Sequence, residues 1–165
     1  MLGGYADELR EAVLRAKRPA GDSVAAALAA LLVARHRDTL AAWAPDVVVP
    51  VPMHWLRRAL RGTSAADEIA RGVAGGLSLP CRRLLRRTKA TTMQNRLPVV
   101  ERRGNVRGAF RPSRRLAGLR VLLVDDVMTT GSTLEACGAA AVSAGAAAVY
   151  AAVVARADAG GSDDA

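Results

Sequence analysis

The chain has little of several residue types on which whole classes of protein depend. Of its 165 residues only 3% are aromatic, and only Cys81 and Cys137 are cysteines. Two cysteines without a C-x-x-C motif cannot supply a zinc site by themselves, and their apolar surroundings favour reduced core thiols. The apolar segments 24–34 and 139–155 are interrupted or too short to span a bilayer, and no signal peptide is recognisable. We therefore expect a cytoplasmic protein with no membrane insertion.

Acidic residues are also scarce. The chain has 15 Asp and Glu against 24 Lys and Arg, a net charge of +9. Most of the excess lies between Cys81 and Arg120, where twelve arginines and Lys89 face Glu101 alone. Such a field attracts pyrophosphate, nucleotides or nucleic acid. Phe110 is the only aromatic residue in this segment, so bases would find few stacking partners, and a solvated basic loop is an equal alternative.

The most informative stretch is VLLVDDVMTTGST, from Val121 to Thr133. Its four aliphatic residues, 121–124, show no alternation with polar residues, which is typical of a strand covered on both faces. Two carboxylates follow, Asp125 and Asp126, and we expect them where the strand ends and the backbone turns. That position is the carboxyl edge of a sheet, where open α/β sheets bind their ligands.

The residues after the two carboxylates favour a bound anion. Segment 129–133 offers hydroxyls, a permissive glycine and free backbone N–H groups just before an alanine-rich helix, and a helix start of this kind attracts phosphate. A phosphate would then lie beside carboxylates able to hold sugar hydroxyls or a hydrated Mg²⁺, which suggests a ribose 5-phosphate. A P-loop is excluded because no G-x-x-x-x-G-K-[ST] occurs. A receiver domain is excluded because the next aspartate after Asp126 is Asp158, in the tail.

This stretch resembles the signature of the type I phosphoribosyltransferases, which bind phosphoribosyl pyrophosphate (PRPP). The resemblance implies that the acidic pair holds the ribose, with Mg²⁺ as cofactor in indirect contact with Asp125 and Asp126. It also implies an α/β fold whose central parallel sheet of about five strands is flanked by helices, with a small N-terminal helical part. The implied ribose and 5-phosphate contacts are Asp125, Asp126, Val127, Met128, Thr129, Thr130, Gly131, Ser132 and Thr133.

A second segment, Asp46–Pro52, is rich in valine and bounded by prolines, which predicts a buried strand. An arginine-rich loop follows it. In the resembling family such a loop binds pyrophosphate, while the alternative is a basic surface loop. The implied pyrophosphate contacts are Val51, Pro52, Met53, His54, Arg57, Arg58 and Arg61.

The string VPVPMHWLRRALRG is similar to the ComF branch of this family, phosphoribosyltransferase-like proteins linked to DNA uptake in competent bacteria. Arg61 and Gly62 match the branch, whereas residues 63–65 replace its Phe-Asn-Gln. Ser64 can still cap the following helix. The chain lacks the cysteine-rich, zinc-binding segment with which ComF-like proteins usually begin.

The stretch from Thr88 to Gly108 is polar, basic and aperiodic, and a loop this long inside a compact domain is functional or disordered. The resemblance implies that it closes over the active site. Lys89, Arg96 and Arg103 are the candidates to neutralise departing pyrophosphate. The expected catalytic residues are Asp125, Asp126, Lys89 and Arg103.

The remaining patterns predict alternating helices and strands. We expect one domain over 1–156, with a helical part at 1–44, a PRPP-binding core at 45–156 and a flexible tail at 157–165. The expected helices cover 5–18, 22–42, 64–75 and 133–144, and the expected strands cover 46–52, 77–87, 121–124 and 147–155.

Two functions remain open on this reading. One is an enzyme that binds PRPP and Mg²⁺ and transfers phosphoribosyl to or from an unidentified base. The other is a non-catalytic PRPP or nucleotide sensor, or a protein that handles single-stranded DNA with the same site. The partners considered are PRPP or pyrophosphate, single-stranded DNA or the competence machinery, and a second copy of the chain in a homodimer.

Overall fold

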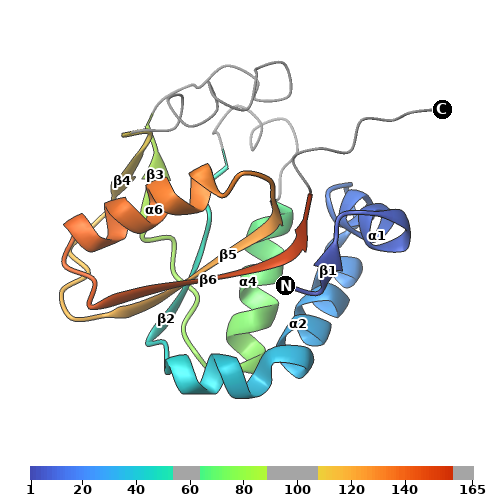
Figure 1. Ribbon diagram of the computed structural model, residues 1–165, viewed down its shortest axis with the longest axis horizontal. Coiled ribbons are helices and arrows are strands. Elements are labelled where there is room, and N and C mark those ends of the chain that lie inside the picture. The colour runs from blue at the N-terminus through green and yellow to red at the C-terminus, as the bar shows by residue number, and fades with distance from the viewer. Residues whose placement is uncertain (54–63, 89–107, 158–165) are drawn as a thin grey trace.

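The centre of the molecule is a parallel sheet (Figure 1). The computed structural model describes residues 1–53, 64–88 and 108–157. In these residues the strands β1 (Gly3–Gly4), β2 (Val47–Pro50), β5 (Arg120–Met128) and β6 (Ala148–Arg156) pair in the order β1-β6-β5-β2. All three pairings are parallel. Parallel neighbours bring their carboxyl ends to one edge of the sheet, which is where a ligand site is expected.

Strands β2 and β5 are apolar because both of their faces are covered. Val48, Leu122 and Val124 belong to one core cluster. Val47, Val121 and Leu123, which alternate with them along the strands, belong to a second cluster on the opposite face. A run of aliphatic residues without alternation is the pattern that such a doubly covered strand requires.

Helices cover the two faces unequally. The first cluster lies under α1 (Asp7–Ala16), α2 (Asp22–Trp43) and α4 (Ala65–Gly76), and the second lies under α6 (Ser132–Ser143) (Figure 1). An antiparallel pair, β3 (Leu85–Arg87) and β4 (Phe110–Pro112), packs on the α6 side. Helices α2 and α4 approach closely at Gly72, where an added Cβ would lie 2.6 Å from the Cβ of Ala29.

The N-terminus is held against the edge of the sheet. The Leu2 N–H donates to the Val154 carbonyl at 2.9 Å, and the Tyr5 N–H donates to the Arg156 carbonyl. His36 Nε2 lies 2.7 Å from the Met1 carbonyl, at a residue of α2 with non-helical backbone. These bonds place the start of α1 beside the carboxyl end of β6.

The expected α/β fold, a parallel sheet flanked by helices, is confirmed, and its helices begin and end within two residues of the expected limits. The sheet has four strands in the described residues, because segment 77–87 contributes only one bridge, between Cys81 and Val48, before it turns into β3. The pair Gly3–Gly4 was not expected as a strand, since glycine has no strand preference and only the pairing with β6 orders it.

Strand β5 also runs further than expected. It continues through both carboxylates to Met128, since Asp125 pairs with Val153 and Val127 pairs with Ala155 on β6. The expectation that the backbone turns at Asp125 is therefore wrong.

None of the helices in the described parts of the chain has the length and hydropathy needed to cross a bilayer. The division into parts at residue 44 stays a prediction, and residues 158–165 of the expected tail lie outside the described residues.

Candidate functional site

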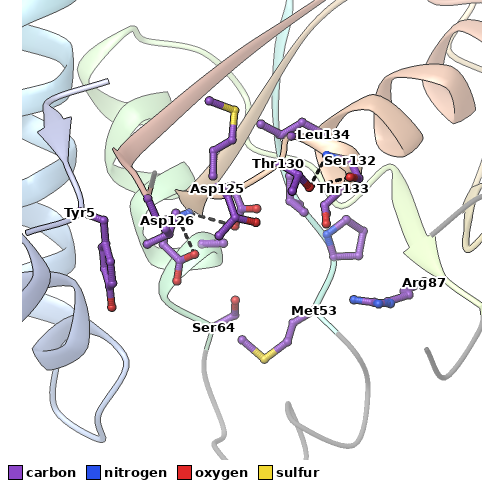
Figure 2. Close-up of a pocket in the computed structure, with 18 of the residues that line it drawn as sticks. Tyr5, Met53, Ser64, Arg87, Asp125, Asp126, Thr130, Ser132, Thr133 and Leu134 are labelled. Carbon is purple, nitrogen blue, oxygen red and sulfur yellow. Dashed lines mark hydrogen bonds between the residues drawn. The ribbon is translucent and has the colours of Figure 1, made fainter. Parts of the chain in front are cut away.

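A cavity of about 390 Å³ opens at the carboxyl ends of β5 and β2 (Figure 2). Several parts of the chain surround it: the end of β5 with the start of α6, the end of β2, the start of α4, the N-terminal segment, β3 and the residue after β6. The lining residues are Tyr5, Lys17, Val51, Pro52, Met53, Ser64, Ala66, Arg87, Asp125, Asp126, Val127, Met128, Thr129, Thr130, Gly131, Ser132, Thr133, Leu134 and Ala157.

The two carboxylates are fixed by the backbone that carries them. The Asp126 N–H donates to Asp125 Oδ1 at 2.9 Å, and the Val127 N–H donates to Asp126 Oδ1 at 2.7 Å (Figure 2). Each carboxylate thus accepts a bond from the next residue of β5. This local bonding orients both side chains toward the cavity.

The two carboxylates have different surroundings. Asp126 Oδ2 lies 2.9 Å from Lys17 Nζ, in an ion pair whose side chains are 15% and 26% exposed respectively. Burial raises the pKa of Asp125 well above its usual range, and the charge of Asp126 raises this pKa further, against the lowering effect of Lys17. Asp125 therefore takes up a proton more readily than an ordinary aspartate does.

The loop after β5 presents a helix start to the cavity. Gly131 precedes α6 with φ of 78°, a left-handed conformation that glycine adopts without strain. Thr130 Oγ1 lies 2.6 Å from Ser132 Oγ (Figure 2), and the Glu135 N–H donates to the Gly131 carbonyl. The Ser132 N–H, the first of α6, donates to Thr130 Oγ1 at 3.4 Å, whereas the N-cap residue Gly131 supplies no side-chain cap. Unpaired N–H groups and neighbouring hydroxyls at a helix start fit a phosphate group.

The end of β2 forms the wall next to the carboxylates. Val51, Pro52 and Met53 line the cavity, and the Val51 N–H donates to the Val124 carbonyl at 2.9 Å. Arg87 of β3 also lines it, with its guanidinium 5.5 Å from the centre of the Phe110 ring. A positive side chain beside a backbone turn suits an anion at this end of the cavity.

Ser64 is a buried hydroxyl without a partner. It precedes α4 and is 2% exposed, yet it forms no side-chain cap, contrary to expectation. Its Oγ has no hydrogen-bond partner among the residues that the structure describes. In Figure 2 this oxygen points toward the side of the cavity where Asp126 lies. A buried polar group without a partner is costly, and a bound ligand is one explanation for keeping it.

The predicted contact residues that the structure describes all line this one cavity: Val51, Pro52, Met53, Asp125, Asp126, Val127, Met128, Thr129, Thr130, Gly131, Ser132 and Thr133. The other candidates lie outside the described residues: His54, Arg57, Arg58, Arg61, Lys89, Arg96 and Arg103.

Four lining residues with polar side chains were not predicted as site residues: Tyr5, Lys17, Ser64 and Arg87. Arg87 and Ser64 lie next to segments with recognisable motifs, and those motifs could have identified them as site residues. Tyr5 and Lys17 lie more than a hundred positions before Asp126, and no sequence pattern links them to it.

The donor set supplies part of a Mg²⁺ coordination shell. Carboxylate and hydroxyl oxygens are the hard donors that Mg²⁺ prefers. However, no cluster of three or more His, Cys, Asp or Glu residues that could hold a metal occurs in the described part of the chain. A Mg²⁺ ion at Asp125 and Asp126 would complete its shell with water and phosphate oxygens, as is usual for this ion.

Comparison with known families matches residues 20–165 to the phosphoribosyl transferase domain. Competence protein F of Haemophilus influenzae is 32% identical over 142 residues, which cover 82% of this chain and 62% of that protein. DNA utilization protein YhgH of Escherichia coli K12 is 32% identical over 154 residues, covering 90% of this chain and 67% of that protein. The chain thus spans about three fifths to two thirds of the length of these relatives.

A solved structure of the allosteric regulatory enzyme of purine biosynthesis has a similar fold. It superposes with a TM-score of 0.56 at 21% identity, over 81% of this chain and 26% of the enzyme. At this identity the likeness concerns the fold alone.

Proposed function

Because the chain belongs to the phosphoribosyl transferase domain family, in its ComF-like branch, we propose that it binds PRPP with Mg²⁺ in this cavity. One observation carries the proposal. The acidic pair Asp125–Asp126, the helix start at Gly131 and the end of β2 share a single cavity. These three features are chemically suited to a sugar diol, a phosphate and a diphosphate respectively.

Each part of PRPP has a matching group in the proposed complex. The 5-phosphate lies at the N–H groups and hydroxyls of 129–133, and the ribose hydroxyls donate to Asp125 and Asp126. The pyrophosphate lies near the backbone of Val51–Met53, and Arg87 offsets part of its charge. Ser64 donates its hydroxyl hydrogen to a ligand oxygen, which would satisfy a group that is otherwise buried without a partner.

We further propose phosphoribosyl transfer at this site. A ring nitrogen of an acceptor base forms the new bond to ribose C1. The bond from C1 to the pyrophosphate oxygen breaks, and its electron pair leaves with pyrophosphate. Asp125, whose pKa is raised by burial, takes the proton released by the acceptor nitrogen. Bound Mg²⁺ supplies positive charge that stabilises the leaving pyrophosphate. The reverse reaction uses the same groups.

The biological setting is also a proposal. The relatives are called competence protein F and DNA utilization protein, and we propose a role in DNA uptake for this chain, in the cytoplasm.

Calorimetry with PRPP and Mg²⁺ tests the binding proposal directly. The native chain should bind, and the double variant Asp125→Asn/Asp126→Asn should not, because amide oxygens accept weaker hydrogen bonds from sugar hydroxyls and carry no charge to attract Mg²⁺. No binding by the native chain refutes the proposal. A screen of purine and pyrimidine bases for pyrophosphate release then separates the two functions, since binding without turnover on any base favours a sensor.

A second candidate function, binding of single-stranded nucleic acid, rests on the β3–β4 pair. Arg86 and Arg111 stand directly opposite each other across the two strands, and both are exposed. Like charges in directly opposed positions destabilise an antiparallel pair unless an anion lies between them. Strands β3 and β4 contain no carboxylate. A phosphate backbone laid over this pair would relieve the repulsion.

Binding of a labelled oligonucleotide at several salt concentrations tests this second function. The variant Arg86→Gln/Arg111→Gln should bind more weakly and show a shallower dependence on salt, because fewer counterions are released. Its affinity for PRPP should equal that of the native chain. Equal oligonucleotide binding by the native and variant chains would rule out the β3–β4 pair as the contact surface.

A further inference from the structure

Lys17 reaches the acidic pair from outside the matched domain. The family match begins at residue 20, and Lys17 is the residue that ends α1. Its ammonium lies 2.9 Å from Asp126 Oδ2 and lines the cavity. Asp126 Oδ1 accepts the Val127 N–H, so the ammonium occupies the oxygen that faces away from the backbone. This is a positive charge at the place where a ligand-bound cation is expected.

The turn that follows Lys17 is built to a tight geometry. The Lys17 N–H donates to the Leu14 carbonyl, and the Gly21 N–H donates to the Arg18 carbonyl. A Cβ added at Gly21 would lie 2.4 Å from the Arg15 carbonyl oxygen, so only glycine fits this approach of the chain to the end of α1. The bonds of Leu2 and Tyr5 to β6 fix the other end of the segment. Lys17 is therefore held in place from both sides.

Charge explains why such a residue is useful in the ligand-free protein. Two adjacent carboxylates repel each other, and a nearby cation reduces that repulsion. The Lys17 ammonium supplies one positive charge to the pair. A divalent cation that approaches Asp126 meets the ammonium first and must overcome its repulsion, because both cations need the same oxygen.

We propose that Lys17 is a built-in counterion that stands in for the divalent cation and must leave Asp126 before metal-bound PRPP can occupy the site. Lys17 is thus a positioning residue: it holds Asp126 in the ligand-free state and sets the cation concentration at which the site fills. The inference rests on the proposed binding of PRPP with Mg²⁺, and it extends that proposal to a segment that the family match leaves out.

Mn²⁺ binding without PRPP tests the inference, with free Mn²⁺ followed by electron paramagnetic resonance. Lys17→Met removes the charge and keeps much of the side-chain length. It should bind Mn²⁺ more tightly than the native chain, by on the order of tenfold, the size of a typical coupling between two sites. Lys17→Arg should resemble the native chain. Arg15→Met is the matched control, because it removes a charge from the same helix at an exposed pair with Glu11.

The outcomes decide between distinct roles. Equal Mn²⁺ affinity in Lys17→Met and Arg15→Met overturns the inference, as does a Lys17→Met chain that binds no Mn²⁺. A third overturning result is weaker PRPP binding by Lys17→Met at saturating Mg²⁺, since Lys17 would then contact the ligand itself. If circular dichroism shows that Lys17→Met is unfolded, Lys17→Gln replaces it, because an amide can still donate to Asp126.

The two proposals fail in different ways. If the native chain binds no PRPP at any Mg²⁺ concentration, the proposed function fails, but the Mn²⁺ comparison still decides the role of Lys17. If PRPP binds and the Mg²⁺ concentration that it needs is the same in the native chain and Lys17→Met, only the counterion role fails. The expected result is PRPP binding by both chains, at a lower Mg²⁺ concentration in Lys17→Met.

Discussion

The cavity has two walls of contrasting origin. One wall runs without interruption from Asp125 to Thr133, and neighbouring residues fix most of its contacts, such as the bond from the Asp126 N–H to Asp125. The other wall contains Tyr5 and Lys17. These residues reach the cavity only because β1 pairs with β6 and the turn at Gly21 is tight. The first wall offers groups to a ligand. The second wall supplies a charge that competes with the ligand's cation.

The difference shows how a shared fold acquires individual properties. A strand, loop and helix start in one short segment form a phosphate site wherever the segment folds, because backbone N–H groups do the binding. A side chain brought from a distant segment can then change the charge of that site without altering its shape. Substitutions in the first wall should therefore weaken ligand binding, whereas substitutions in the second wall should change the affinity of the site for its cation.

The largest expected effect comes from the first wall. Gly131→Val forces a β-branched residue into φ of 78°, which should shift the loop and weaken PRPP binding by on the order of 100-fold. Gly138→Ala is the control on the same helix, since its added Cβ meets only Val149 at an ordinary 3.8 Å. Calorimetry measures both. Native-like affinity in Gly131→Val would show that the helix start does not bind the phosphate.

A smaller effect is expected at Ser64, which lines the same cavity just before α4. Ser64→Ala should weaken PRPP binding by roughly tenfold, the value of one hydrogen bond to a charged group. The unfolding temperature without ligand should not fall, because the hydroxyl has no partner to lose. Ser143→Ala is the control: its hydroxyl donates to the Ala140 carbonyl, so it should lose a little stability and no affinity. A loss of stability without a loss of affinity in Ser64→Ala would assign Ser64 to the fold alone.

A substitution in the turn at Gly21 should disrupt the second wall. In Gly21→Ala the new Cβ meets backbone atoms, which cannot move aside as a flexible side chain can. We expect a loss of about 1–3 kcal/mol in the free energy of unfolding, measured with urea. Mn²⁺ affinity should rise, as in Lys17→Met, because Lys17 is displaced from Asp126. Gly4→Ala, which meets nothing within 4 Å, should change neither quantity.

The smallest expected effect is on the stability of the ligand-free protein, which the raised pKa of Asp125 lowers at high pH. The raised pKa of Asp125 means that the folded chain holds this proton more tightly than the unfolded chain. Stability is therefore lost as pH rises from about 4, the usual value for aspartate, through the raised pKa. Asp125→Asn avoids this loss, and without ligand it should melt roughly 2–4 °C higher than the native chain at pH 8.

The same comparison at low pH provides the check. Near pH 3.5 the two chains should melt together, because Asp125 is protonated in both the folded and unfolded states. Asp46→Asn should behave in the opposite sense, since the hydrogen bonds of Arg120 hold the pKa of Asp46 below its usual value. That variant should lose stability at pH 8 and lose none at low pH. A pH-independent gain in Asp125→Asn would mean that desolvation of the charge is not its cause.

Some expectations failed for identifiable physical reasons. The aspartates were expected where the strand ends and the backbone turns, yet pairing with β6 extends β5 through both of them. Segment 77–87 was expected as a full strand, but it leaves β2 after Cys81 to pair with β4. Ser64 has the identity of a helix cap but faces the cavity instead. In the first two cases a contact between distant segments overrode a local preference.

The sequence by itself determined the parallel sheet, its doubly covered central strands and the phosphate-type loop. These depend on periods and motifs within short segments, and neighbouring residues impose them through backbone geometry. Only the tertiary structure decided that Lys17 lies 2.9 Å from Asp126 and that two glycines form an edge strand. It also decided that Ser64 is buried with no hydrogen-bond partner among the described residues. Such contacts join residues far apart in the chain, and no local preference encodes them because their energy exists only after the chain has folded.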